Sequence, residues 1–115
     1  MRVRREFEFE AAHRLPRHEG KCRRPHGHSY RLAVTVEREV DPESGLAIDF
    51  SELKAVVERE VVATLDHRDV NEVLENPTAE AMAVWIWGRL AGPLGGLVEV
   101  ELHETRSCSV VYRGE

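Results

Sequence analysis

The chain has 115 residues, and its 16 basic and 21 acidic side chains give it a net charge of −5. This length predicts a single domain over residues 1–115, and the acidic balance argues against a nucleic-acid binder, which needs excess Lys and Arg to neutralise phosphates. No apolar run is long enough to cross a membrane or form a signal peptide, and two cysteines make a poor disulfide framework, so we expect a cytoplasmic protein.

Two strands are expected in the first third of the chain. Residues 3–13 alternate between apolar and charged side chains, which is typical of a half-buried strand, and His13 falls on the apolar parity with Phe7 and Phe9. The alternation returns at residues 26–36. One face of this second strand carries His26, His28, Tyr30, Leu32, Val34 and Val36.

Two helices are expected after a turn at residues 41–45. Residues 49–65 carry an apolar stripe at helical spacing, and Asp49 with Glu52 resembles a capping box at its start. Residues 76–93 form the second helix, which Asn-Pro-Thr opens and Gly-Pro closes.

The last two strands are expected near residues 97–105 and 108–113. The resulting order, ββααββ, predicts an α+β fold in which a four-stranded antiparallel sheet carries two helices on one face. The other face is polar and the sheet edges are open, so we expect subunits to associate.

Three histidines lie on apolar parities of the two predicted strands: His13 on the first, and His26 and His28 on the second. If these strands pair, the three imidazoles converge at one end of the sheet. Three neutral imidazoles leave one position of a tetrahedral zinc ion open, which is the pattern of a catalytic site. The alternative is a set of core histidines with satisfied hydrogen bonds. Burying three polar rings is difficult to explain by packing, so the sequence favours a metal.

Cys22 lies four residues before His26 in a basic segment. It is a fourth ligand, which would make the site structural, or a thiolate stabilised by the metal and its basic neighbours; the third interpretation, an inert loop cysteine, is disfavoured by the positive charge around it. Residues 14–31 contain six Lys or Arg against one acidic residue, the reverse of the whole chain. A basic segment beside a metal suits an anionic substrate, phosphate above all.

Two further candidates carry carboxylates. Asp66 and His67 end the first predicted helix, and Asp66 orients His67 only if the helix unwinds there; otherwise Asp66 caps a turn. Glu104 shares the parity of Val100 and Leu102, so its charge is expected to point to the buried side of the sheet. A buried carboxylate needs a partner. That partner is either a nearby arginine, Arg106 or Arg113, in a salt bridge, or a bound ligand.

The sequence resembles the 6-pyruvoyl-tetrahydropterin synthase superfamily nearly from end to end, and most of all its bacterial branch, which makes 6-carboxy-5,6,7,8-tetrahydropterin for queuosine biosynthesis. The segments that carry the resemblance are FEAAHRLP, CRRPHGHSY, IDFSELK, LDHRDVNEVLENPTAE and ETRSCSVVYRGE. The short spacing from Cys22 to His26 is similar to that of the carboxy branch. Members of the family have the tunnelling fold, in which the sheets of several subunits join into a barrel. The resemblance therefore implies a homohexamer built as a dimer of trimers.

The resemblance also implies a role for each candidate residue. It assigns His13, His26 and His28 as zinc ligands, and it assigns Cys22, Asp66 and His67 as catalytic residues. Glu104 is assigned to anchor the pterin.

The implied activity is a zinc-dependent lyase reaction. It converts 7,8-dihydroneopterin triphosphate to 6-carboxy-5,6,7,8-tetrahydropterin, acetaldehyde and triphosphate. Two alternatives stay open. One is 6-pyruvoyl-tetrahydropterin synthase activity on the same substrate, and the other is a zinc-binding scaffold without turnover, which would need only the histidines.

Overall fold

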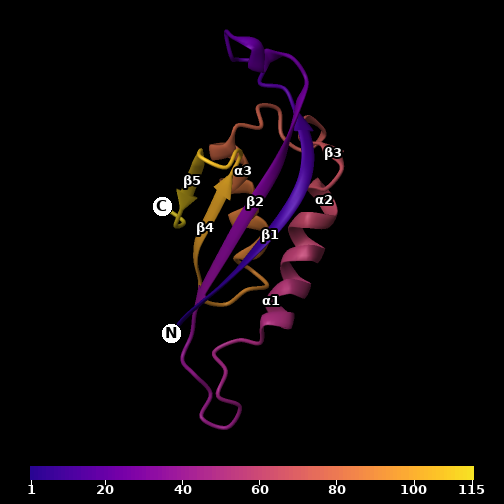
Figure 1. Cartoon of the computed structure of the whole chain (residues 1–115). Helices are drawn as coiled ribbons and strands as arrows, with labels where there is room; N and C mark the ends of the chain where they lie inside the picture. The colour runs from indigo at the N-terminus through magenta and orange to yellow at the C-terminus, as the bar shows by residue number, and fades with distance from the viewer.

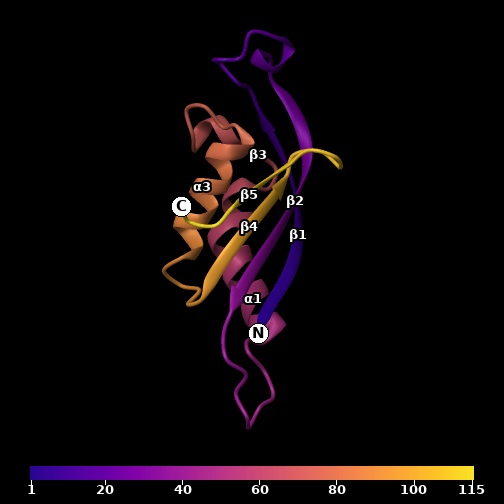
Figure 2. The same cartoon turned by 90° about the vertical axis from the view of Figure 1, so that its left-hand side faces the viewer.

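The computed structural model describes all 115 residues, and its backbone forms one sheet with the helices packed against a single face (Figures 1 and 2). The strands are β1 (Arg2–His13), β2 (His26–Glu37), β3 (Arg68–Asp69), β4 (Leu97–His103) and β5 (Ser109–Tyr112). They lie side by side in the order β3-β1-β2-β4-β5. The predicted α+β class and the single helical layer are confirmed.

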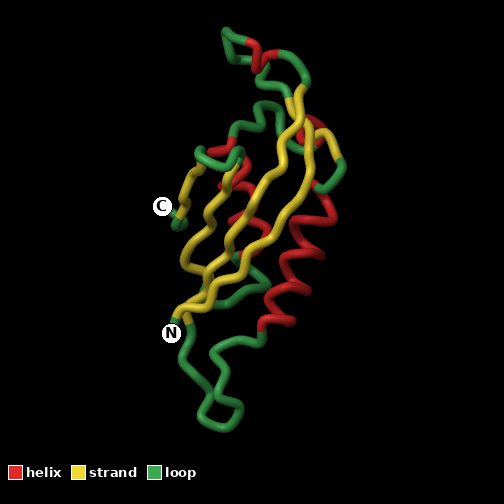
Figure 3. The backbone as a smooth tube through the Cα atoms, in the orientation of Figure 1, coloured by secondary structure: helices red, strands yellow, loops and turns green.

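β1 and β2 form the longest element, an antiparallel hairpin that extends beyond the rest of the molecule (Figure 3). Its register pairs Phe9 with Tyr30 and, at the end joined by the loop of residues 14–25, His13 with His26. The predicted alternation is confirmed, because Phe7, Phe9 and His13 are buried while the glutamates between them are exposed. Since side chains alternate with period two, this register brings the three histidines to one face.

The first helical segment comprises α1 (Phe50–Val57), a π-helical turn η2 (Glu58–Val62) and α2 (Ala63–Leu65). Asp49 caps α1 by accepting a hydrogen bond from the backbone N–H of Ser51, but Glu52 accepts no hydrogen bond from the Asp49 N–H, so the capping box is incomplete.

The wider π-helical turn coincides with a contact to the second long helix. The Arg89 guanidinium donates to the Glu60 carbonyl at 3.0 Å and lies 3.2 Å from the Glu60 carboxylate.

The second long helix, α3 (Ala79–Leu90), begins at its N-cap residue Thr78 and buries Met82, Ile86 and Leu90 against the sheet. These side chains complete a core formed with the apolar faces of β1, β2 and β4. No helix of the chain is both long enough and apolar enough to cross a lipid bilayer.

The predicted sheet of four antiparallel strands is wrong in one respect, because β3 adds a fifth strand that runs parallel to β1. It pairs Arg68 with Ala11 and Asp69 with Ala12. Two exposed residues are too few to produce an alternating pattern, so the sequence carried no signal for this strand. The two short 3-10 turns, η1 (Lys21–Arg23) and η3 (Val70–Glu72), were also not predicted.

Candidate metal centre and adjoining cavity

His13, His26 and His28 meet at the end of the β1–β2 hairpin, as the sequence predicted. One nitrogen from each ring lies within 4.8 Å of the others, so the three could hold one metal ion. The His13 and His28 rings are nearly perpendicular, with centroids 5.1 Å apart, and the His13 and His26 rings meet at 67° with centroids 4.6 Å apart. The arrangement follows directly from the strand register, which pairs His13 with His26.

Backbone carbonyls fix the tautomers of two of these rings. His13 Nδ1 lies 2.8 Å from the Pro77 carbonyl, and His26 Nδ1 lies 2.8 Å from the Arg24 carbonyl. Because a carbonyl oxygen only accepts, Nδ1 must carry the proton in both rings, and Nε2 is left with a free lone pair. Orientation of this kind by an outer partner is typical of metal-ligating histidines.

The remaining nitrogens lack protein partners. Nε2 of His13 and Nε2 of His28 are buried without a hydrogen bond. Burial lowers the pKa of both imidazoles. The nearby Glu104 carboxylate acts to raise each pKa, but its effect is smaller than that of burial. Both rings are therefore expected to be neutral near pH 7, which is the protonation state that binds metals.

The Glu104 carboxylate lies next to these unpaired nitrogens and adds a negative charge to the site. Glu104 Oε1 lies 3.5 Å from His13 Nε2 and 3.9 Å from His28 Nε2. With His13 neutral and protonated on Nδ1, this is a lone pair facing a carboxylate rather than an ion pair. A metal cation at this place satisfies the orphaned nitrogens and offsets the acidic charge. The three histidines and their surroundings therefore fit a metal ion.

Cys22 lies beside the histidines but outside the group whose donor atoms converge. It sits in the turn η1, where its carbonyl accepts a hydrogen bond from the Leu15 N–H, and its side chain is half-buried. A cavity of about 420 Å³ opens there. It is lined by Leu15, Lys21, Cys22, His26, His28 and Glu104. A cavity of this size accommodates a small organic ligand.

Asp66 and His67 are in contact because α2 ends at Leu65, so the unwinding that the pair required is found. His67 has a left-handed backbone (φ 57°), and its Nδ1 lies 3.0 Å from Asp66 Oδ1. The Asp66 carboxylate also accepts a hydrogen bond from the Glu10 N–H, which, followed by the contacts with His67, lowers the pKa of Asp66.

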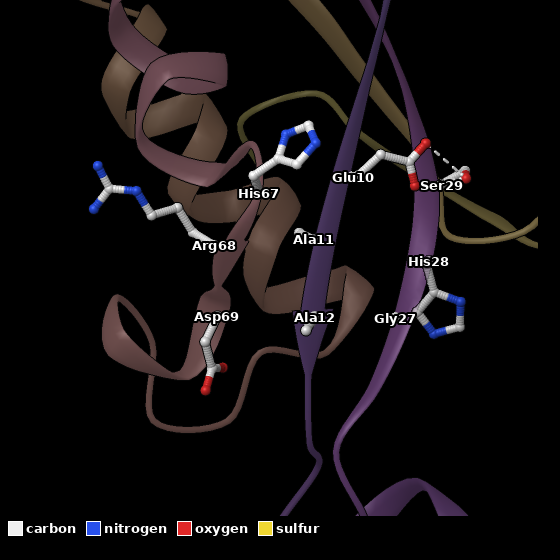
Figure 4. Close-up of a pocket in the computed structure, with 9 residues that line it drawn as sticks. All are labelled: Glu10, Ala11, Ala12, Gly27, His28, Ser29, His67, Arg68 and Asp69. Carbon is white, nitrogen blue, oxygen red and sulfur yellow. Dashed lines mark hydrogen bonds between the residues drawn. The ribbon is translucent and has the colours of Figure 1, made fainter.

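The structure does not place this pair in the cavity with Cys22 of the same chain. His67 lines a different, open pocket of about 480 Å³ at the β3 edge, together with Glu10, Arg68 and Asp69. Figure 4 shows the His67 ring beside β1, while the His28 ring on β2 points away from it. The His67 side chain is 78% exposed.

Glu104 follows the last residue of β4 and faces the histidines, as its predicted parity requires. The expected salt-bridge partners do not contact it, since Arg113 pairs with Glu99 and Arg106 forms no ion pair. Sequence reasoning missed the carbonyls of Pro77 and Arg24. Every residue has a carbonyl, so no residue type could have indicated them.

Comparison with known proteins gives a consistent result. The 6-pyruvoyl tetrahydropterin synthase family profile matches residues 2–115. A 6-carboxy-5,6,7,8-tetrahydropterin synthase from Synechocystis is 47% identical over 94% of this chain and 89% of its own length. A 6-pyruvoyl tetrahydrobiopterin synthase from Pongo abelii is 36% identical over 98% of this chain and 91% of its own.

A solved structure supports the same relationship. The 6-pyruvoyl tetrahydropterin synthase of Caenorhabditis elegans superposes with a TM-score of 0.83, at 29% identity, over 100% of this chain and 96% of its own. Fold, extent of match and identity all agree, and the chain therefore belongs to the 6-pyruvoyl tetrahydropterin synthase family.

Proposed function

We propose that this protein is a zinc-dependent lyase that converts 7,8-dihydroneopterin triphosphate and one water molecule to 6-carboxy-5,6,7,8-tetrahydropterin, acetaldehyde and triphosphate. The observation that carries the proposal is the cavity in which Cys22 and Glu104 adjoin three imidazoles with free nitrogens. The similarity to a 6-carboxy-5,6,7,8-tetrahydropterin synthase at 47% identity favours this product over others. Queuosine biosynthesis in the cytoplasm is part of the same proposal.

The metal would be held by His13, His26 and His28, and when bound it supplies a Lewis acid that polarises oxygens of the substrate side chain. We propose that Cys22 removes a proton from this side chain as general base, since its thiol lines the same cavity. Glu104 would orient the pterin, because two carboxylate oxygens match the adjacent ring N–H and exocyclic amine.

Asp66 and His67 are proposed as the group that supplies or shuttles a second proton. Asp66 contacts Nδ1 of His67, so it orients the ring and leaves Nε2 for the exchange. Because His67 is exposed at the β3 edge and does not line the Cys22 cavity of its own chain, we propose that it acts in an assembled oligomer.

The test is incubation of zinc-loaded protein with 7,8-dihydroneopterin triphosphate and identification of the products by mass spectrometry. We expect 6-carboxy-5,6,7,8-tetrahydropterin and one equivalent of acetaldehyde, and we expect neither from the metal-free protein. A control incubation with Cys22→Ala protein checks that the products depend on the cavity thiol. An absence of both products from zinc-loaded protein would refute the proposal.

The second candidate is 6-pyruvoyl-tetrahydropterin synthesis, favoured by the relatives that carry that name. It uses the same substrate and would release no acetaldehyde, so the same assay separates the two. A zinc-binding scaffold is the remaining alternative, and it would give no product at all. The scaffold needs only the histidines, whereas Cys22 and Glu104 also line the cavity here.

A further inference from the structure

The loop of residues 14–25 carries the Cys22 thiol, and the side chain of Asn71 holds the start of this loop. Asn71 Oδ1 accepts a hydrogen bond from the Arg14 N–H at 2.8 Å, and Asn71 Nδ2 donates to the Arg14 carbonyl at 2.9 Å. One amide therefore satisfies both backbone groups of the residue that follows β1. Such groups are otherwise bonded by the backbone of a neighbouring strand, but β3 has already ended at Asp69.

The position of Asn71 is fixed by its own turn. It belongs to η3, where its backbone N–H donates to Asp69 Oδ1 at 2.9 Å. The preceding residue, Val70, is completely buried, so the turn is anchored in the core of the protein. The amide of Asn71 is therefore presented to Arg14 by an anchored element.

A short chain of hydrogen bonds leads from Arg14 to the thiol-bearing residue. The N–H of Leu15, the next residue, donates to the Cys22 carbonyl at 2.8 Å and joins the two sides of the loop. Farther along the loop, the Arg24 carbonyl accepts a hydrogen bond from His26 Nδ1 at 2.8 Å. Cys22 is therefore held from both sides, toward the histidines on one and toward η3 on the other.

A second contact between the loop and the segment after β3 is weaker. Arg17 lies 3.4 Å from Glu75, but the two side chains are 70% and 85% exposed. An exposed ion pair of this kind contributes little, because solvent screens it and two long side chains lose freedom. Asn71 is half-buried and bonds to backbone groups at a strand end, which have less freedom to lose. We therefore expect Asn71 to be the stronger restraint on the loop.

We propose that Asn71 is a positioning residue for the Cys22 thiol. By fixing Arg14 it sets the direction in which the loop leaves β1, and this direction decides how Cys22 faces the cavity that it shares with His28 and Glu104. The inference rests on the proposed function for the role of the thiol as general base. A catalytic group that is held in place before the substrate binds gains much of its effect from that placement, and a small displacement is costly.

The first test measures the thiol itself. Cys108→Ser is introduced into every protein, so that Cys22 is the only thiol, and this parent is compared with Asn71→Ala, which removes both bonds to Arg14. We expect Cys22 of Asn71→Ala to react with iodoacetamide about fivefold faster, because local opening of the loop exposes the half-buried thiol. Glu75→Gln is the matched control, since it removes only the exposed contact with Arg17 and should react like the parent.

Turnover and metal content complete the test. We expect kcat of Asn71→Ala to fall about tenfold with little change in KM, because the placement of a general base acts on the transition state. Zinc should stay stoichiometric, since the three histidines lie on β1 and β2. The Glu75→Gln control should match the parent in both measurements.

A parental alkylation rate or a parental kcat in Asn71→Ala would overturn the inference. So would a lower thermal stability with an unchanged alkylation rate, because Asn71 would then be only a structural contact. Loss of zinc would also overturn it and would make Asn71 a support of the metal centre. An absence of turnover in the parent protein would count against the proposed function, whereas the alkylation rates would still decide whether Asn71 positions the thiol.

Discussion

His28 and Cys22 line the same cavity, but truncating them is expected to have different effects. His28 Nε2 is one of three converging donors, so His28→Ala should lose stoichiometric zinc. Cys22 lies outside that group, so Cys22→Ala should retain zinc and lose turnover. Metal analysis of both purified variants checks this. Loss of zinc from the cysteine variant would make Cys22 a ligand and would favour a structural site.

Glu104→Gln tests the acidic end of the cavity. Glutamine presents one acceptor and one donor, so it sets an N–H against an N–H of the pterin, at a cost of about 1–3 kcal/mol for an unsatisfied buried group. We expect pterin affinity to fall by about tenfold or more, with folding and zinc content retained. Pterin titration, thermal unfolding and metal analysis together check this.

Two outcomes would contradict that role for Glu104. Wild-type pterin affinity with lower thermal stability would make Glu104 a structural partner of His13. Loss of zinc would make it a metal ligand, a role that its 3.5 Å distance from His13 Nε2 brings within reach.

Asp66 should make stability depend on pH. Its pKa is lowered in the folded state, first by the hydrogen bond from the Glu10 N–H, so its stabilising effect is present above the usual aspartate pKa. That contribution is lost as the pH falls below about 4 and through the folded pKa. Asp66→Asn should therefore lower the free energy of unfolding at pH 7, and its difference from wild type should shrink in acid.

Glu8→Gln is the control for Asp66→Asn, because Glu8 is exposed on β1 and its side chain has no hydrogen-bond or ion-pair partner. Denaturant unfolding at several pH values measures both variants. If the free energy of unfolding of Asp66→Asn were lower than that of wild type by the same amount from pH 7 to pH 3, the charge of Asp66 would not act through its hydrogen bond with the Glu10 N–H.

Among individual residues, the sequence was most informative where strand parity decides the direction of a side chain. His13, His26, His28 and Glu104 were placed from alternation alone, and the structure brings them together. The location of His67 could not be obtained in this way. It depends on a left-handed residue and on the backbone of Glu10, which lies far away in the sequence.

At the scale of elements, the start of α3 supports the metal centre. Thr78 caps α3 by accepting a hydrogen bond from the Ala81 N–H at 3.1 Å, and the preceding Pro77 carbonyl holds His13. Thr78→Ala should lower the free energy of unfolding by about 1 kcal/mol. It should also weaken zinc binding, because the anchor of His13 loosens.

Thr78→Ser is the control, since serine retains the capping oxygen and should behave as wild type in both assays. Chemical unfolding and competition with a zinc chelator provide the measurements. Unchanged zinc affinity in a destabilised Thr78→Ala protein would separate the cap from the metal centre.

The elements also show where local sequence patterns fail. α1 and α3 were predicted because a stripe of apolar residues and a capping residue are both local signals. β3 has only two residues, and its existence depends on the edge of β1 being available after the chain turns at His67. The π-helical turn η2 likewise has no signal in residue type, since its residues are ordinary helix formers.

At the scale of the whole molecule, the sheet ends in open strands on both sides, with β3 at one edge and β5 at the other. Unpaired strand edges favour association, so we expect an oligomer in dilute solution, and the family resemblance implies a hexamer. Light scattering at micromolar concentration measures the mass. A monomer under these conditions would contradict the prediction.

Two exposed valines offer a matched test of that assembly. Val111 lies on the edge strand β5 and is 49% exposed, whereas Val84 lies on α3 and is 50% exposed. A lysine at an edge strand opposes strand pairing, so Val111→Lys should shift the protein toward smaller species. Val84→Lys should leave the mass unchanged. Equal masses for both variants would show that β5 takes no part in the interface.

His13 and His26 lie opposite each other at the base of the loop formed by residues 14–25. An ion bound by both is therefore a cross-link that closes this loop and removes chain entropy from it, as a disulfide does elsewhere. Cys22 belongs to the closed loop, so metal loading also restricts its motion. Amide hydrogen exchange in this loop should speed up when the ion is withdrawn, and a shortage of metal would then also leave the Cys22 thiol less well positioned.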